Sequence, residues 1–253
     1  EGQVGKNLEA ICEDKKLDSL AVNKSYLDIT DQSKVSSLIK DINPGVIINA
    51  AAYTNVDKAE EEEELAYDVN SNGPKNLARV CQELSIPLIH ISTDYVFDGE
   101  KGSPYKEDDA PNPINIYGKT KLQGELEIQS ILDKFIILRT SWVFNKRGNN
   151  FMNTILNLCE TNSNLNIVDD QYGAPTSAKS VAEAIIKICS IYTKKNRFTS
   201  GIYHFSGKEY VSWYEFAQRI IDIAYDQGSI VKKPSLTKIT TKEYLTKSTK
   251  PVN

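Results

Sequence analysis

The chain has 253 residues, of which 40% are hydrophobic and 25% charged, proportions that are ordinary for a globular protein. Its net charge of −4 argues against a nucleic-acid partner, and no apolar run approaches the ~20 residues that cross a bilayer. Cys12, Cys81, Cys159 and Cys189 lack the C-x-x-C spacing of metal or redox sites, and the chain has only two histidines. We therefore expect reduced core thiols, a cytoplasmic location, no metal cluster and no membrane contact.

The first motif is a glycine turn, Gly2-Gln3-Val4-Gly5, and a helical apolar pattern follows it. Glycines at this spacing let the backbone approach a pyrophosphate, which then sits on the N-terminus of the helix. Two glycines three residues apart are common, so the turn by itself is a weak signal. A strand normally precedes it, so we expect a dinucleotide-binding domain without its first strand.

The next apolar run, residues 20–22, predicts a short strand that ends at Asn23 and Lys24. Enzymes specific for NAD usually place an acid about 20 residues beyond the glycines, where it binds the ribose 2′-hydroxyl. An amide followed by a cation favours NADPH, or the use of both NADPH and NADH. Asp28 and Ile29 come shortly after and can line the adenine; the alternative is that Asp28 or Thr30 is the N-cap of the next helix.

Short apolar runs then alternate with helical patterns, which predicts a doubly wound α/β fold of Rossmann type with a parallel sheet. The runs are almost continuously apolar, as expected for strands buried on both faces. Strands are predicted at 46–50, 87–92, 135–139 and 201–205, and helices at about 31–42, 57–84, 115–132, 177–192 and 212–225. The glutamates at 60–64 favour a solvated helix face over a metal or partner site.

Beyond Trp142 the pattern loosens into polar, turn-rich stretches, which suggests a second, smaller lobe at the carboxyl edge of the sheet. The predicted division is a dinucleotide-binding domain at 1–142, to which 174–200 return, and a substrate-binding lobe made of 143–173 and 201–253.

Residues that can carry chemistry follow two of the predicted strands. Asn49-Ala50-Ala51-Ala52-Tyr53 comes after the first, and its small side chains either let a flat dinucleotide lie against the backbone or allow close helix packing. Ser92-Thr93-Asp94-Tyr95 comes after the next. Tyr117 and Lys121 then open a helix on one face, four residues apart. Because a nearby ammonium lowers the pKa of a phenol, this pair suits proton donation to a ketone that receives hydride.

In these motifs the sequence resembles the extended short-chain dehydrogenase/reductase superfamily and, within it, the dTDP-4-dehydrorhamnose reductases. The resemblance runs through nearly the whole chain. The motifs that carry it are Gly2-Gln3-Val4-Gly5, Leu27-Asp28-Ile29-Thr30, residues 49–60, residues 92–99, Tyr117-Gly118-Lys119-Thr120-Lys121, Arg139-Thr140-Ser141-Trp142 and Gly173-Ala174-Pro175-Thr176.

The resemblance implies hydride transfer from NADPH or NADH to the C4 ketone of dTDP-4-dehydro-L-rhamnose, in the synthesis of cell-surface polysaccharide. Tyr117 would protonate the alkoxide, Lys121 would hold the nicotinamide ribose, and Thr93 would complete the catalytic triad. The residues implied to bind cofactor, besides the Tyr–Lys pair, are Gly2, Gln3, Val4, Asp28, Ile29, Ala52, Tyr53 and Thr54. Those implied to bind the nucleotide sugar are Thr93, Asp94 and Trp142, with core packing as the alternative for Trp142. A homodimer and a Mg²⁺ ion that we cannot assign to residues are also family expectations.

Two other functions share these motifs. A nucleotide-sugar epimerase or dehydratase would place an acid near Asn23, and a dehydratase would follow the threonine with an Asp-Glu pair, where this chain has Asp94-Tyr95. A non-catalytic regulator, like the regulatory subunit of methionine adenosyltransferase, would keep the fold and the motifs without turnover.

Overall fold

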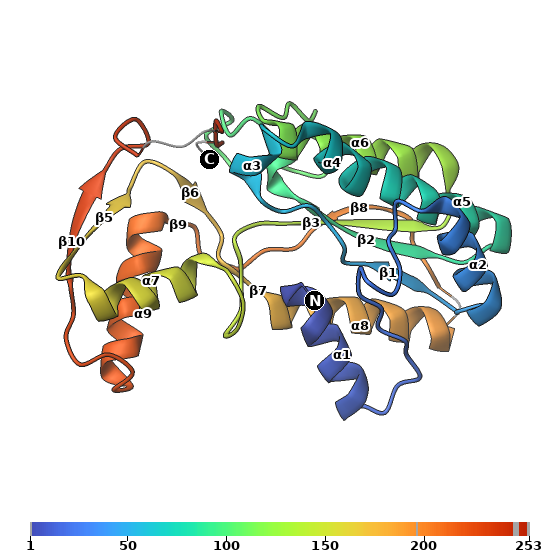
Figure 1. The fold of residues 1–253 in the computed structure, drawn as a ribbon, viewed down its shortest axis with the longest axis horizontal. Helices are drawn as coiled ribbons and strands as arrows, with labels where there is room; N and C mark the ends of the chain where they lie inside the picture. Colours follow the sequence, from blue (N-terminus) through green and yellow to red (C-terminus); the bar gives the residue numbers. More distant parts are fainter. Residues whose placement is uncertain (1, 196, 245–247, 252–253) are drawn as a thin grey trace.

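The computed structural model describes residues 2–195, 197–244 and 248–251. Within them the chain forms two parts, a larger one on the right of Figure 1 and a smaller one on the left. The larger part is built on a four-stranded sheet, and the smaller part on two helices with a pair of strands. The outer bounds of the two predicted domains, residues 1 and 253, lie outside the described residues.

A parallel sheet with the strand order β1–β2–β3–β8 organises the larger part. Its strands are β1 (Ile47–Asn49), β2 (Leu88–Thr93), β3 (Phe135–Thr140) and β8 (Gly201–His204). Ile48 is in register with Ile89, which is in register with Ile136. All three neighbouring pairs run parallel, so the strands end at one edge of the sheet. The predicted α/β fold with a parallel sheet is confirmed.

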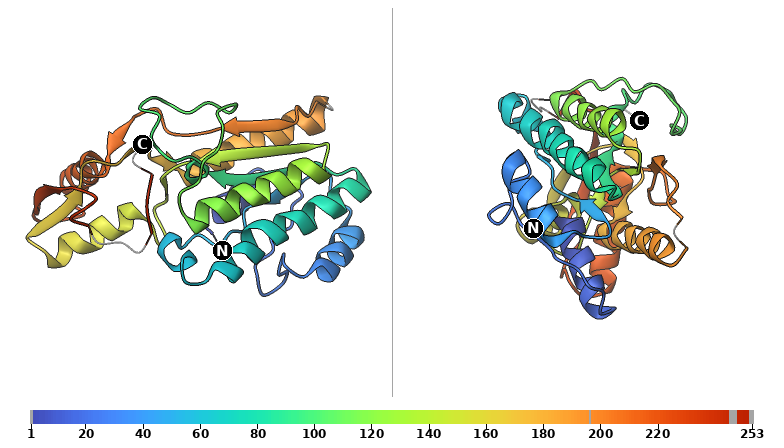
Figure 2. Two further views of the ribbon diagram at one scale, coloured as in Figure 1. Left: turned by 90° about the horizontal axis from the view of Figure 1, so that it is seen from above. Right: turned by 90° about the vertical axis from the view of Figure 1, so that its right-hand side faces the viewer.

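Helices cover both faces of this sheet (Figure 1). One layer contains α2 (Gln32–Ile42), α5 (Gly73–Leu84) and α6 (Ile116–Ile131), which lie side by side in Figure 2; the other contains α1 (Gln3–Asp14) and α8 (Ala178–Lys195). Leu88 packs with the first layer, against Leu77 and Ile128, whereas its neighbour Ile89 packs with the second, against Val181. Successive strand residues point to opposite faces, so a sheet covered on both sides needs a continuous apolar run.

The smaller part has a core of its own, which includes Ile155, Phe216 and Ile221. Its elements are α7 (Phe151–Thr161), α9 (Trp213–Asp226) and the parallel strands β5 (Asn164–Val168) and β10 (Ser235–Ile239). Two short strand pairs join it to the sheet: β4 (Val143–Phe144) with β7 (Thr176–Ser177), and β6 (Tyr172–Gly173) with β9 (Val211–Ser212). Helix α9 starts in a capping box formed by Ser212 and Glu215.

The strand predicted at residues 20–22 is wrong. These residues form no strand, and Leu20 and Val22 are 59% and 40% exposed. A three-residue run needs a neighbouring strand to supply its hydrogen bonds, and in the described part of the chain β1 pairs only with β2. Leu27 is buried under α5, and the chain enters α2 at Asp31, which caps that helix through Lys34 N–H.

The helix predicted at 57–84 is broken once, at residues 60–62. Helix α3 (Val56–Ala59) lies before the break, and after it α4 (Glu63–Tyr67), the π-helical turn η1 (Asp68–Asn72) and α5 follow one another with helical backbone at each junction. Glu62 has a non-helical backbone before α4, and Pro74 follows directly on the π-helical turn. The glutamates therefore lie at the ends of two short helices and not along one face.

Two further differences concern the second half of the chain. Helix α7 and the pair β5–β10 were not predicted, because their amphipathic patterns are short and interrupted by asparagines. The strand predicted at 201–205 is β8, which pairs with β3 in the central sheet and so does not lie in the smaller lobe to which 201–253 were assigned.

Candidate active site

The structure brings Thr93, Tyr117 and Lys121 together at the carboxyl end of β2. Thr93 is the last residue of β2, and Tyr117 and Lys121 lie one turn apart at the start of α6. Asn115 caps that helix by accepting the N–H of Gly118 at 2.8 Å, which fixes where α6 begins. The side chain of Thr93 lies close enough to the Tyr117 phenol to lower its pKa. The three residue types expected from sequence therefore meet at one strand end.

The electrostatics of Tyr117 differ from the sequence argument. Burial raises the pKa of Tyr117 to about 12; the hydrogen bond from Thr93 opposes this shift and the Asp94 carboxylate adds to it. Lys121 does not lower this pKa as expected, because its Nζ points to the carbonyl oxygen of Ile91 (2.7 Å) and to His90 (3.2 Å). Tyr117 therefore holds its proton at neutral pH, as a proton donor must.

Asp94 adds an acid that can change charge near neutral pH. Burial raises the pKa of its carboxyl to about 6, against hydrogen bonds from Thr93 and from backbone N–H groups. Oγ1 of Thr93 donates to Oδ1 of Asp94 at 3.0 Å. The ring of Tyr95 packs edge-on against Tyr117, with 5.5 Å between centroids. The Tyr117 phenol thus lies near a hydrogen-bonded pair made by Thr93 and Asp94.

Gly118 is required by close packing at the start of α6. A Cβ at this position would lie 2.1 Å from the carbonyl oxygen of Tyr95 and 3.0 Å from Pro113. We predict that Gly118→Ala displaces Tyr117 and lowers kcat about 10- to 100-fold, since a shift of about 1 Å at a catalytic group has effects of this size. Gly45→Ala is the control, because its added Cβ meets nothing within 4 Å. Equal kcat values in the two variants would contradict the prediction.

The start of α1 has the features of a dinucleotide phosphate site. Gly2 precedes the helix without a side-chain cap, and a Cβ there would lie 3.9 Å from the carbonyl oxygen of Ala50, just beyond β1. The start of α1 therefore lies at the carboxyl end of β1, and among the described residues no side chain caps its first N–H groups, an arrangement that fits a pyrophosphate. Val4 faces the core, and Gln3 accepts from Asn150 at 2.8 Å.

The other residues expected at the cofactor lie around the same edge. Ala52 is half-buried and Thr54 exposed, and the backbone of Tyr53 is held at both N–H and carbonyl by the side chain of Asn70. Asp28 accepts from the N–H and the hydroxyl of Thr30 within its own turn, and the N-cap of α2 is Asp31, so the expectation that Asp28 or Thr30 caps this helix is wrong. Binding of NADPH by these residues stays a prediction.

Trp142 lies where the two parts of the chain meet. Its backbone is left-handed, with φ of 46°, and its ring stacks on Trp213 with 3.4 Å between centroids. Gly173 is required beside it, because a Cβ there would lie 2.3 Å from the indole. Packing accounts for these contacts of Trp142, and contact with a nucleotide sugar stays a prediction.

Sequence reasoning missed a buried polar group behind the site. Glu125 and Arg139 form an ion pair that is almost fully buried, with the carboxylate bonded to both Nε and Nη2. Asn49 and His90 lie behind Lys121 and are equally buried. The signal was available as a histidine, a glutamate and an arginine at apolar positions of predicted strands and a helix.

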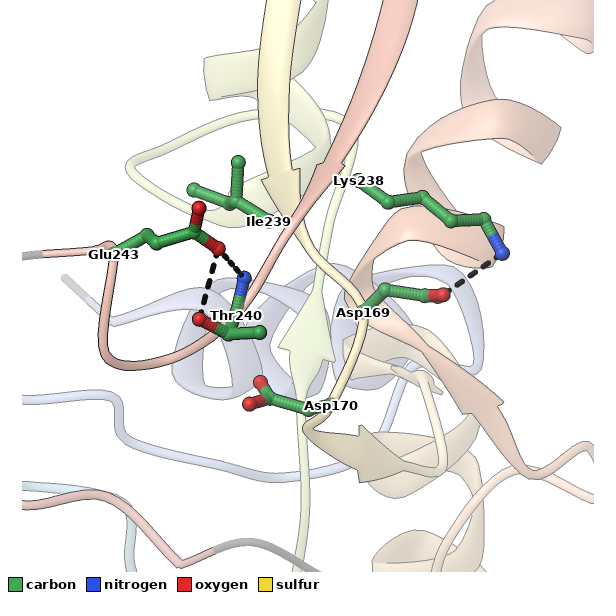
Figure 3. Close-up of a pocket in the computed structure, with 6 residues that line it drawn as sticks. All are labelled: Asp169, Asp170, Lys238, Ile239, Thr240 and Glu243. Carbon is green, nitrogen blue, oxygen red and sulfur yellow. Dashed lines mark hydrogen bonds and ion pairs between the residues drawn. The ribbon is translucent and has the colours of Figure 1, made fainter.

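A second polar hollow lies in the smaller part, at the ends of β5 and β10 (Figure 3). Its acids already have partners: Asp169 pairs with Lys238 at 2.8 Å, Glu243 accepts from Thr240, and Asp170 accepts from Thr241. Among the described residues, no three His, Cys, Asp or Glu side chains are placed to share a metal ion. No described helix is both long and apolar enough for a membrane span.

Comparison with known proteins places these features in one family. The sequence matches the family described as the RmlD substrate binding domain over residues 1–253. It is 43% identical to a dTDP-4-dehydrorhamnose reductase of Aggregatibacter actinomycetemcomitans over 100% of this chain and 86% of the relative. For the same enzyme of Sinorhizobium fredii the identity is 40%, over 92% of this chain and 79% of the relative.

A solved structure agrees in fold as well as in sequence. The dTDP-4-dehydrorhamnose reductase of Bacillus anthracis, in complex with NADP, superposes with a TM-score of 0.90 at 36% identity. The match covers 99% of this chain and 85% of that one.

Proposed function

This chain belongs to the RmlD substrate binding domain family, and on that premise we propose that it is an NADPH-dependent reductase that converts dTDP-4-dehydro-L-rhamnose to dTDP-L-rhamnose. The observation that carries the proposal is the meeting of Thr93, Tyr117 and Lys121 at the end of β2. These residues lie at the carboxyl edge of a parallel sheet, where ligands of such folds bind.

Tyr117 is the proton donor of the proposed reaction. Its phenol stays protonated at neutral pH and can give its proton to the C4 oxygen as that oxygen gains negative charge. NADPH, when bound, supplies the hydride that reaches the C4 carbon. Thr93, whose hydroxyl donates to Asp94 in this structure, lies beside the phenol and can turn that hydroxyl to donate to the substrate oxygen.

Lys121 and the edge of the sheet hold the reactants. By family resemblance Lys121 binds the nicotinamide ribose, the turn at Gly2 the pyrophosphate, and Asp94 and Trp142 the sugar nucleotide. The chain's four cysteines are free thiols, in accord with a cytoplasmic enzyme. A homodimer belongs to the same proposal, and size-exclusion chromatography with light scattering tests it.

The test of the function is turnover by the full-length protein. NADPH oxidation with dTDP-4-dehydro-L-rhamnose should be fast, and NMR of the product should show reduction at C4 with the L-rhamno configuration. Interconversion of nucleotide sugars without net NADPH oxidation would indicate an epimerase. Binding of NADPH without turnover of any 4-keto sugar nucleotide would indicate a regulatory protein, and either result would reject the proposal.

Asn23 provides a test of cofactor choice. It is exposed and accepts from Ser25 and Tyr26, two contacts that an aspartate can keep. Asn23→Asp should shift the NADPH/NADH ratio of kcat/KM toward NADH by about 10- to 100-fold, because a carboxylate bonds the 2′-hydroxyl and repels a 2′-phosphate. Asn23→Ser, which adds no charge, is the control. An unchanged ratio in Asn23→Asp would place cofactor discrimination at another residue.

A further inference from the structure

His90 of β2 is a fully buried histidine that the proposed reaction does not use. Its two ring nitrogens face two different side chains. Nδ1 lies 3.0 Å from Nδ2 of Asn49, its register partner on β1, and Nε2 lies 3.2 Å from Nζ of Lys121 on α6. The imidazole therefore links the end of β1 to the lysine of the candidate active site.

The orientation of the Asn49 amide decides which ring nitrogen carries the proton. Its Oδ1 accepts the backbone N–H of Ala51 at 3.1 Å. Turning the amide by 180° would place two N–H groups against each other at Ala51, so Nδ2 must be the atom that faces His90. Since Nδ2 can only donate, Nδ1 of His90 is the unprotonated, accepting nitrogen.

His90 is neutral in this environment. Burial is the main cause that holds the pKa of His90 well below its usual range, and a charge on Lys121 would only add to it. A neutral imidazole carries one proton, and with Nδ1 accepting from Asn49 that proton sits on Nε2. The Nε2–H points at Nζ of Lys121, where an amine can accept it but an ammonium has no lone pair to do so.

The other groups around Lys121 also affect whether its Nζ is protonated. The carbonyl oxygen of Ile91 accepts from either form of Nζ and so fixes its position. Glu125, one turn along α6, raises the pKa of Lys121, but Arg139 of β3 neutralises this carboxylate. The short helix η2 (Asp94–Val96) carries one further carboxylate, that of Asp94, and its charge raises the pKa of Tyr117.

We propose that His90, oriented by Asn49, is a positioning residue for Lys121: its Nε2–H donates to the Nζ amine and favours the uncharged form of the lysine. Burial acts in the same direction and lowers the pKa of Lys121 to about 8. Lys121 can then lose and regain a proton near neutral pH while the carbonyl of Ile91 keeps Nζ in place. The link to catalysis rests on the proposed function, whereas the tautomer of His90 does not.

Nitrogen NMR tests the tautomer without any turnover. The chain has only two histidines, so ¹⁵N-histidine labelling of the full-length, NADPH-bound protein gives two rings, and His204→Gln assigns them. His90 should show a protonated Nε2 and an unprotonated Nδ1. Asn49→Asp should reverse this, because a carboxylate accepts from Nδ1–H while its second oxygen keeps the Ala51 bond. A protonated Nδ1 in wild type, or an unchanged tautomer in Asn49→Asp, overturns the proposal.

The pH dependence of kcat tests the effect on Lys121. His90→Leu removes the N–H donor, so the alkaline limb should move upward by about half a unit to one unit, the shift that loss of one hydrogen bond produces. His90→Gln keeps an N–H₂ group near Nζ and should retain the wild-type limb. Equal limbs in both variants would make His90 merely structural. If no substrate is turned over at all, the proposed function fails, and the NMR result still decides the tautomer.

Discussion

Replacing Tyr117 by phenylalanine should lower kcat for sugar-nucleotide reduction by about 10²- to 10⁴-fold, the usual contribution of a positioned general acid. Phenylalanine keeps the ring and its edge-on contact with Tyr95, and it loses only the hydroxyl. The alkoxide that forms at C4 must then take its proton from water or from a less well placed group. Stopped-flow or steady-state NADPH oxidation at saturating substrate measures the loss.

Binding data separate this effect from a damaged fold. The Kd of NADPH, measured by fluorescence, and the Tm should both stay near the wild-type values, because no core contact changes. Tyr192→Phe is the matched control, since this tyrosine on α8 packs on Phe198 away from the site. A Tyr117→Phe variant that keeps more than about a tenth of wild-type kcat would assign the proton to another acid, with Asp94 as the next candidate.

The large elements could be predicted because their signals are local. Residues 46–50, 87–92 and 135–139 are apolar runs too short for helices, and they became β1, β2 and β3 within one residue or so. Helix α6 starts at an asparagine cap before Tyr117, and its apolar pattern runs to Ile131. The candidate triad follows from this, because the ends of parallel strands meet at one edge.

The errors arose where a neighbour decides the structure. Residues 20–22 have the composition of a strand, but strand formation depends on a paired edge that a single segment cannot supply. The break in the helix predicted at 57–84 depends on the non-helical backbone of Glu62, and apolar periodicity reveals neither this break nor the wider turn of η1 beyond it.

The direction of the Tyr117 pKa shift could not be read from spacing. Residues four apart on a helix share a face, which led us to expect the Lys121 charge beside the phenol. The long lysine side chain instead reaches inward to the carbonyl of Ile91 and to His90. Burial of the phenol then dominates, and burial depends on the whole fold.

The second large effect concerns the ion pair behind the site. Glu125 and Arg139 are 0% and 3% exposed, and Nε and Nη2 of Arg139 both bond the Glu125 carboxylate. The guanidinium of Arg139 also stacks over the ring of Phe97. Glu125→Leu should lower the free energy of unfolding by about 3–5 kcal/mol, because it leaves a buried guanidinium without a countercharge. Urea denaturation followed by circular dichroism measures this loss.

Removing both residues of this ion pair should affect stability differently from removing one of them. A buried ion pair repays little more than the cost of removing its two charges from water, so replacing both residues by apolar ones should be far less harmful than replacing one. Glu125→Leu with Arg139→Met should therefore recover most of the stability lost in Glu125→Leu. The exposed pair of Lys179 and Glu183 is the control, and Glu183→Leu should change the free energy of unfolding by less than about 0.5 kcal/mol. If Glu125→Leu and Glu183→Leu lower the free energy of unfolding equally, the buried pair does not hold α6 against β3. The positions of Tyr117 and Lys121 must then depend on the Asn115 cap and on the close contact at Gly118.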